Sequence, residues 1–182
     1  MDTDLFGEPV ESADWTERWL AEHDAATFPE RHRRLRQTIE IMPDGTFMMP
    51  VEAHAVFTEA RSTYVNGDFA SVLMVAQAFV EHRLQGYLEG QGQTKVAKSG
   101  LAKILEYCEQ HRLLDPLILK GLDHLRRIRN PFTHLRPFED PHTLAQRSLR
   151  MRLHPAELME QEAFRAFSLM LTVAVARLPN ER

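Results

Sequence analysis

The chain has 182 residues, a formal net charge of −4 and a single cysteine. A chain of this length fits one domain, which buries roughly 70% of its unfolded surface and needs no metal or disulfide to hold it together. With Cys108 alone, an intrachain disulfide and a multi-cysteine zinc site are both excluded. The apolar spacing of LAKILEYCEQH around Cys108 favours a buried thiol.

The first fifteen residues, MDTDLFGEPVESADW, have neither a basic start nor an apolar run. They do not resemble a secretory signal, so we expect a cytoplasmic location. No stretch of the chain approaches the length of about 18 uninterrupted apolar residues that crosses a bilayer. We therefore expect a soluble protein that does not enter a membrane.

Residues 1–13 show no periodicity and are expected to form a flexible tail. Residues 14–50 are predicted to form an N-terminal extension. Its first short helix carries Trp15 and Trp19, which are four residues apart and therefore share one face. A second short helix is predicted from Pro29 through Arg36.

The extension is predicted to end in a small β-hairpin over residues 37–50, QTIEIMPDGTFMMP. β-branched and aromatic residues stand on both sides of Pro43-Asp44-Gly45, a sequence typical of a tight turn. Two strands alone are only marginally stable, so this hairpin is expected to lean on the rest of the domain.

From residue 51 to residue 182 the apolar period becomes 3.6. A first core helix is predicted from Val51 to about Asn66, with Asp68 as the cap of the next. That second helix, DFASVLMVAQAFVEHRLQGYLEG, has an apolar stripe broad enough for the centre of a bundle. After a linker around GQGQ, a third helix is expected to turn its apolar side inward through Leu101, Ile104, Leu105 and Cys108.

Two Asp-Pro pairs predict further helix starts. Asp115-Pro116 opens a helix with a buried face of Leu117, Ile118, Leu122, Leu125 and Ile128, which is expected to end near Arg129 because Pro131 cannot continue it. Asp140-Pro141 predicts a short helix through about Met151. Pro155 is expected to open the last long helix.

The fold class is therefore all-α, with four or five helices packed around one core in residues 51–182. The predicted hairpin and the short accessory helices are additions to this bundle. We expect one domain overall.

Basic residues gather in one part of an acidic chain. Asp123, Glu139 and Asp140 are the acidic residues of a span whose basic residues are Lys120, Arg126, Arg127, Arg129, Arg136, Arg147, Arg150 and Arg152. Such a patch can attract a polyanion through phosphate contacts. A solvated helix face is the alternative interpretation.

The most informative residues within this span are Arg129-Asn130-Pro131-Phe132-Thr133-His134. A bare Arg-x4-His pair is weak evidence, because Arg18 and His23 form another. The surrounding LRRIRNPFTHLRP, however, resembles the R-x4-6-H motif of HEPN ribonucleases (higher eukaryotes and prokaryotes nucleotide-binding), in which a polar residue, often Asn, follows the Arg. Asn130 fits that position.

Residues 59–90, EARSTYVNGDFASVLMVAQAFVEHRLQGYLEG, are similar to the first two core helices of the HEPN family, including an apolar helix that contains Glu81. The resemblance extends over about residues 53–178 and is sharp at residues 126–136. It implies a HEPN-like helical bundle and a metal-independent endoribonuclease without a cofactor.

The side chains suit this chemistry. RNA carries its own nucleophile, since a deprotonated ribose 2′-hydroxyl can attack the adjacent phosphate and leave a 2′,3′-cyclic phosphate. His134 can transfer that proton near neutral pH, which typically contributes on the order of 10²- to 10⁴-fold. The guanidinium of Arg129 can stabilise charge on the phosphate oxygens, and Asn130 can orient either group.

One histidine per chain does not supply both an acid and a base. Members of the HEPN family pair two R-x4-6-H motifs across a symmetric interface, so the resemblance implies a homodimer with a shared cleft. Arg126, Arg127 and Arg136 would then line an RNA path. The family commonly serves as toxins or phage-defence effectors, which implies an antitoxin or a defence-complex partner.

Two other hypotheses remain open. The first is a catalytically inactive HEPN-like module that docks a partner protein or a nucleotide, in which His134 only caps a helix end. A histidine-based metal hydrolase is disfavoured, because the nine histidines are scattered and form no HExxH or similar ligand cluster.

Overall fold

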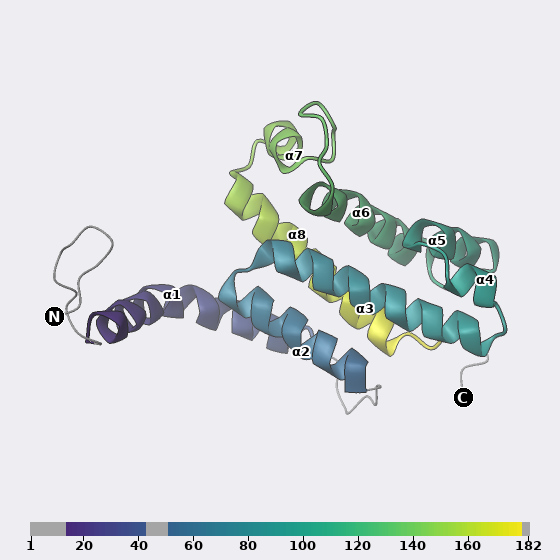
Figure 1. The fold of residues 1–182 in the computed structure, drawn as a ribbon, viewed down its shortest axis with the longest axis horizontal. Coiled ribbons are helices and arrows are strands. Elements are labelled where there is room, and N and C mark those ends of the chain that lie inside the picture. The colour runs from purple at the N-terminus through teal and green to yellow at the C-terminus, as the bar shows by residue number, and fades with distance from the viewer. Residues whose placement is uncertain (1–13, 43–50, 180–182) are drawn as a thin grey trace, which may run out of the picture.

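The computed structural model describes residues 14–42 and 51–179, and within these ranges the regular secondary structure is all α-helical, joined by turns and loops (Figure 1). The helices are α1 (Asp14–Glu40), α2 (Val51–Asn66), α3 (Phe69–Gly90), α4 (Thr94–Ala97), α5 (Leu101–Gln110), α6 (Pro116–Thr133), α7 (Leu144–Met151) and α8 (Pro155–Val175). The predicted all-α class is confirmed. Not one of the described helices combines the length and the apolar character that a membrane span requires.

Helix α3 is the centre of the bundle and packs most extensively against α8 and α2. Its predicted apolar stripe is buried, at Val72, Leu73, Ala76, Phe79, Val80, Leu84 and Leu88. An apolar face this broad can contact several neighbours at once, which is why α3 also touches α4, α5 and α6.

The buried residues form two clusters that α3, α6 and α8 share. The first cluster joins α2 to the N-terminal half of α3 and to α8, around Tyr64, Leu73 and Phe167. The second joins the C-terminal half of α3 to α5 and to the start of α6, around Leu84, Ile104 and Leu122. Cys108 lies in the second cluster and is fully buried, as its apolar surroundings predicted.

The N-terminal extension differs from the prediction. Residues 14–40 form one continuous helix that contains Pro29, in place of two short helices followed by a strand. The first predicted hairpin strand is therefore wrong over residues 37–40, while residues 43–50 lie outside the described part of the chain. Contacts with α2 explain the helix: Thr38 is fully buried, and the hydroxyl of Tyr64 donates to Oε1 of Gln37 at 2.8 Å.

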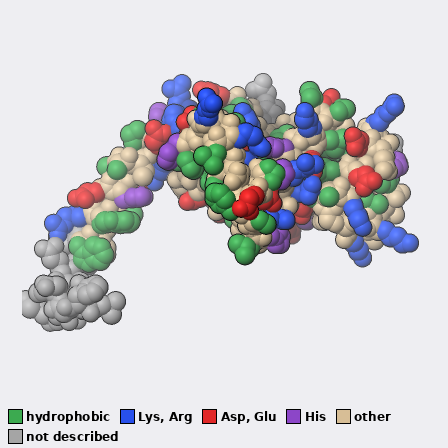
Figure 2. Space-filling model, turned by 90° about the horizontal axis from the view of Figure 1, so that it is seen from above, with side chains coloured by type: hydrophobic (Ala, Val, Ile, Leu, Met, Phe, Trp, Pro, Cys, Tyr) green, Lys and Arg blue, Asp and Glu red, His purple; other side chains and the backbone are tan. Residues whose placement is uncertain are grey.

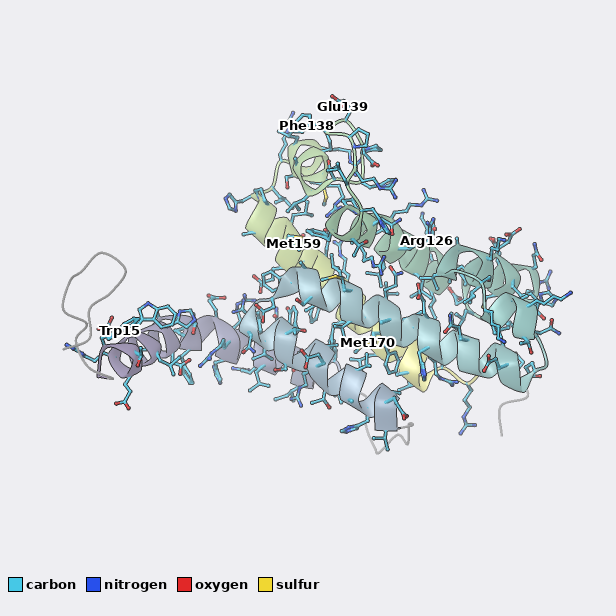
Figure 3. The ribbon with its side chains drawn as sticks, viewed as in Figure 1. Trp15, Arg126, Phe138, Glu139, Met159 and Met170 are labelled. Carbon is cyan, nitrogen blue, oxygen red and sulfur yellow. The ribbon has the colours of Figure 1, made fainter. Side chains whose placement is uncertain are left out.

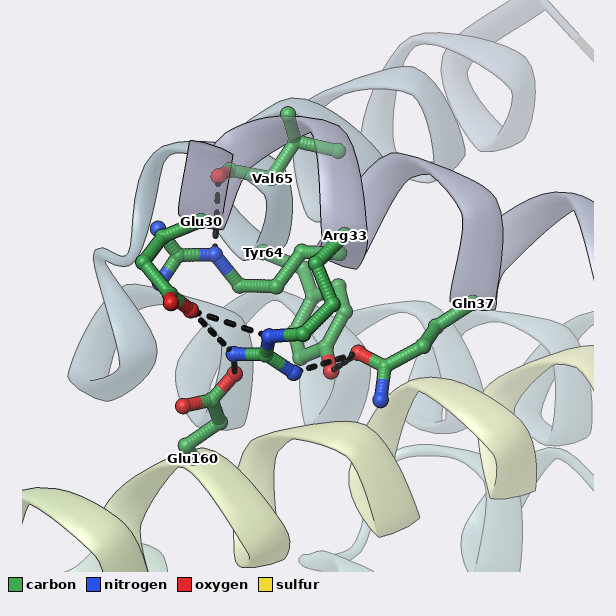
Figure 4. A network of polar contacts seen from close by, with 7 residues as sticks. Glu30, Arg33, Gln37, Tyr64, Val65 and Glu160 are labelled. Atoms are coloured by element: carbon green, nitrogen blue, oxygen red, sulfur yellow. Dashed lines mark hydrogen bonds and ion pairs between the residues drawn. The ribbon is translucent and has the colours of Figure 1, made fainter. Parts of the chain in front are cut away.

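Polar contacts fasten the C-terminal half of α1 to the bundle (Figure 4). The guanidinium of Arg33 lies between the carboxylates of Glu30 and Glu160, so it joins α1 to α8. The Nε of Arg34 donates to the carbonyl of Val65 at 3.1 Å, and its guanidinium lies over the ring of Phe69. These contacts fix α1 to the α2–α3 corner.

The N-terminal half of α1 extends away from the bundle (Figures 1 and 2). Its aromatic side chains remain largely exposed, at 47% for Trp15, 59% for Trp19 and 60% for Phe28. Among the described residues, Trp19 stacks on His23 and Phe28 on His32, each within α1 itself. This half of the helix therefore presents apolar surface to solvent.

The first Asp-Pro helix start is confirmed, since the side chain of Asp115 accepts from the backbone N–H of Leu117 at 2.7 Å. Leu117 itself is 78% exposed, because it lies in the first turn before α6 meets its neighbours, and Leu119 is buried instead. The second start is displaced. Helix α7 begins at Leu144, where Thr143 caps the N–H of Gln146, while Asp140 closes the preceding turn.

Candidate nucleic-acid interface at the end of helix α6

Helix α6 continues through Pro131 and ends at Thr133, so the predicted end near Arg129 is four residues too early. Proline in the last turn removes only one hydrogen bond, because its missing N–H would have met the carbonyl of Arg127. The carbonyl of Asn130 accepts from the backbone N–H of His134 at 2.9 Å and from the hydroxyl of Thr133 at 3.2 Å. These contacts complete the final turn.

His134 is the residue at which the chain leaves α6, with an extended backbone (φ −137°, ψ 129°). Its side chain is exposed, and its imidazole makes no hydrogen bond to the described residues. Phe132 packs against the first core cluster instead, so the aromatic ring of the motif turns inward and the imidazole outward. A capping role, in which the ring would bond a helix carbonyl, has no such contact here.

Arg129 lies one turn before the end of the helix. Its Nη1 donates to the hydroxyl of Thr133 at 3.2 Å, while its Nε is buried without a hydrogen-bond partner among the described residues. A rise of about 1.5 Å per residue separates Arg129 from His134 by roughly 7 Å along the helix axis, which an arginine side chain can span. The two residues therefore lie at the same end of α6, but five positions apart they point to different sides of the helix axis, and the structure shows no contact between their side chains.

Asn130 and Arg126 share one face of α6, since they are four residues apart. Together they line a hollow of about 430 Å³, whose other walls are Gln77 and Glu81 of α3 and residues 99–103 at the start of α5. Arg126 lies where α6 faces α3 and α5 (Figure 3). The structure thus brings together two of the predicted site residues in a hollow that Arg129 and His134 do not line.

Arg126 and Arg127 both pair with Asp123. Nε and Nη2 of Arg126 donate to Oδ1 at 3.1 and 2.7 Å, and Nη2 of Arg127 lies 2.6 Å from Oδ2. Partial burial raises the pKa of Asp123, but its contacts with Arg126 and Arg127 outweigh this and lower the pKa. One of the two arginine charges is thereby neutralised, which reduces the local positive excess expected from the sequence.

Two other basic residues of this span, Arg136 and Arg147, lie in different surroundings. Arg136 is exposed in the loop between α6 and α7, whose tip, with Phe138 and Glu139, lies away from the bundle (Figure 3). Arg147 is buried and pairs with Glu162 of α8 at 2.7 Å. It also donates to the carbonyl of His142, which ties the loop to the bundle. Arg147 therefore belongs to the interior, and including it in a surface patch was wrong.

Sequence reasoning missed two residues of the hollow. Gln77 is 4% exposed and occupies a position within the apolar stripe of α3, which is an unusual place for an amide. Lys103 is exposed on the first turn of α5. A glutamine within an otherwise apolar stripe is a feature of the sequence that could have pointed to Gln77. No feature of the sequence distinguishes Lys103 from other exposed lysines.

The described residues contain no group of three or more His, Cys, Asp or Glu side chains that could hold a metal ion. Searches against models of protein families, curated proteins and solved structures found no match to this chain. The site must therefore be interpreted from its own side chains.

Proposed function

We propose that this protein is a metal-independent endoribonuclease with Arg129, Asn130 and His134 at its reactive site. The observation that carries the proposal is the position of His134, whose exposed imidazole has no hydrogen bond to the described residues and lies one turn beyond Arg129. An imidazole and a guanidinium at the same helix end can supply proton transfer and charge stabilisation, two of the functions that RNA cleavage by its own 2′-hydroxyl requires. The resemblance of residues 125–137 to the HEPN motif supports the same chemistry.

In this reaction the imidazole of His134 takes the proton of the ribose 2′-hydroxyl. The 2′-oxygen forms a bond to phosphorus, the bond from phosphorus to the 5′-oxygen breaks, and a proton is delivered to that leaving oxygen. Arg129 stabilises the charge on the non-bridging oxygens, and Asn130 orients the participating groups. The products are a 2′,3′-cyclic phosphate and a free 5′-hydroxyl.

A second copy of the chain would supply the second histidine, so the proposal includes a homodimer in which two α6 ends face one cleft. Arg126, Arg127 and Arg136 would guide the RNA backbone toward it, although the ion pairs with Asp123 weaken the first two. The HEPN resemblance also favours a cytoplasmic toxin or phage-defence effector with an antitoxin or defence-complex partner.

The test is incubation of total RNA in EDTA with the wild-type chain, with His134→Ala and with His54→Ala, a matched control at an exposed position of α2. We expect the wild type and His54→Ala to produce 2′,3′-cyclic phosphate ends, and His134→Ala to lose at least a hundredfold in rate. Cleavage that persists unchanged in His134→Ala would contradict the proposal. If the homodimer is the active form, the specific activity should fall on dilution over the same range of protein concentration in which sedimentation shows the dimer dissociating into monomers.

The alternative function is a catalytically inactive module that docks a partner protein. The exposed Trp15, Trp19 and Phe28 on the extended half of α1 favour it, because apolar surface on a projecting helix is typical of an interaction site. This reading predicts no cleavage by the wild type and equal partner binding by the wild type and His134→Ala.

A further inference from the structure

The hollow between α3, α5 and α6 has the features of a ligand site. Its volume of about 430 Å³ lies within the range of small-molecule sites. One wall is the start of α5, where Gly100 is the N-cap and offers no side chain to the first turn. The backbone N–H groups of Lys103 and Ile104 donate to the carbonyl of Gly100. Those of Leu101 and Ala102, in the first turn, have no hydrogen-bond partner among the described residues.

Two cationic side chains accompany this helix start. Lys103 lines the hollow from α5 and Arg126 from α6. Asp123 accepts from Nε and Nη2 of Arg126, and Nη1 of Arg126 has no hydrogen-bond partner among the described residues. Unpaired backbone N–H groups, the positive end of a helix dipole and two cations together favour an anionic group such as a phosphate.

The opposite wall requires a different kind of contact. Gln77 is buried, and its Nε2 donates to the carboxylate of Glu81 at 2.7 Å, which fixes the orientation of the amide. Its Oε1 is then a buried acceptor with no donor among the described residues. Buried acceptors are rarely left unpaired, so this wall favours a ligand that brings a hydrogen-bond donor.

A ribose hydroxyl next to a phosphate meets both requirements. The geometry points to a binding site for one ribonucleotide unit, with its phosphate at the start of α5 beside Lys103 and Arg126, and a ribose hydroxyl directed to Gln77 and Glu81. The 2′-hydroxyl is a donor that DNA lacks, so the site would select RNA over DNA. The ligand could be a free nucleotide or one unit of an RNA chain. Only the second case rests on the proposed ribonuclease function.

Titration calorimetry tests the site with adenosine 5′-monophosphate, its 2′-deoxy analogue and inorganic phosphate on the full chain. We expect the ribonucleotide to bind more tightly than the other two. Lys103→Gln should weaken that binding about tenfold by removing a charge-assisted contact, whereas Lys120→Gln, the same change on an exposed part of α6 outside the hollow, should not.

Gln77→Leu tests the contact with the ribose hydroxyl separately from any general effect on packing. Leucine suits the apolar stripe of α3, so the fold should persist. The variant should lose the preference for the ribonucleotide over its deoxy analogue while it retains phosphate binding. Equal binding of ribonucleotide and deoxyribonucleotide by the wild type, or affinities in Lys103→Gln and Gln77→Leu equal to that of the wild type, would overturn the inference.

A short single-stranded RNA, titrated into His134→Ala to avoid cleavage, distinguishes the two sources. Binding at least tenfold tighter than that of the mononucleotide assigns the site to an RNA chain, and equal binding assigns it to a free nucleotide. These results are independent of the cleavage assay. If His134→Ala loses cleavage but Lys103→Gln binds the nucleotide as the wild type does, the binding site in the hollow is rejected and the nuclease proposal stands. If His134→Ala still cleaves but Lys103→Gln binds more weakly, the nuclease proposal is rejected and the binding site stands.

Discussion

Arg147 and Glu162 form an ion pair that is almost completely removed from solvent, with side-chain exposures of 1% and 3%. Burial raises the pKa of Glu162, and the adjacent guanidinium of Arg147 partly opposes that rise. Hydrogen bonds from Arg147 to the carbonyls of Ile128 and His142 add to the pair and connect α6, the following loop and α8. This cluster holds the segment that follows His134.

Removal of one partner of this pair should destabilise the protein strongly. For Arg147→Met we expect a loss of about 3–5 kcal/mol in the free energy of unfolding, because the carboxylate of Glu162 is left buried without its countercharge. The double variant Arg147→Met, Glu162→Leu should recover most of this loss. Urea unfolding measures both, with Arg150→Met, at an exposed position of the same helix, as the control. Equal stability of Arg147→Met and Arg150→Met would contradict the structural role.

Cys108 offers a second prediction at this scale. Burial raises the pKa of its thiol to about 11, so the thiolate, which is the reactive form, is scarce at neutral pH. We expect the native protein to react with a thiol reagent at pH 8 only slowly, and the urea-unfolded chain to react at once. Fast reaction of the native chain would show that α5 opens readily.

At the scale of helices, the sequence predicts which helices form more accurately than where each helix begins and ends. The helices from Val51, Phe69, Leu101, Pro116 and Pro155 all occur, since a long 3.6-residue period has no competing interpretation. The sequence predicts a helix boundary at Pro29 and another at Pro131, but both prolines lie inside helices. A proline removes one hydrogen bond, a cost that the tertiary contacts of α1 and the end of α6 outweigh.

Two glycines within helices provide a matched pair of substitutions. A Cβ at Gly86 of α3 would meet nothing within 4 Å, whereas a Cβ at Gly121 of α6 would lie 2.9 Å from a methyl group of Leu169 in α8. Gly86→Ala should stabilise the protein by about 1 kcal/mol through helix propensity. Gly121→Ala should gain less, because Leu169 must shift. Thermal unfolding compares the two, and an equal gain would mean that α6 and α8 pack more loosely than the structure indicates.

At the scale of the whole molecule, the candidate site divides into a local part and a tertiary part. The placement of Arg126 with Asn130, and of Arg129 with Thr133, follows from helical spacing, so the sequence could predict it. The hollow could not be predicted in this way. Its walls come from α3, α5 and α6, and only packing of the second core cluster brings the start of α5 opposite Gln77.

The two tryptophans of the chain both lie on the extended half of α1, so their fluorescence reports this region alone. At low protein concentration we expect emission close to that of the urea-unfolded chain and ready quenching by acrylamide, because both indole rings are about half exposed. A partner or a second copy that covers α1 should shift the emission to shorter wavelength and protect it from acrylamide. A dimer formed only through the ends of α6 would leave the emission unchanged as the protein associates. The measurement therefore separates assembly at the proposed nuclease site from docking through α1, and blue-shifted, protected emission from a dilute monomer would contradict the extended position of the helix.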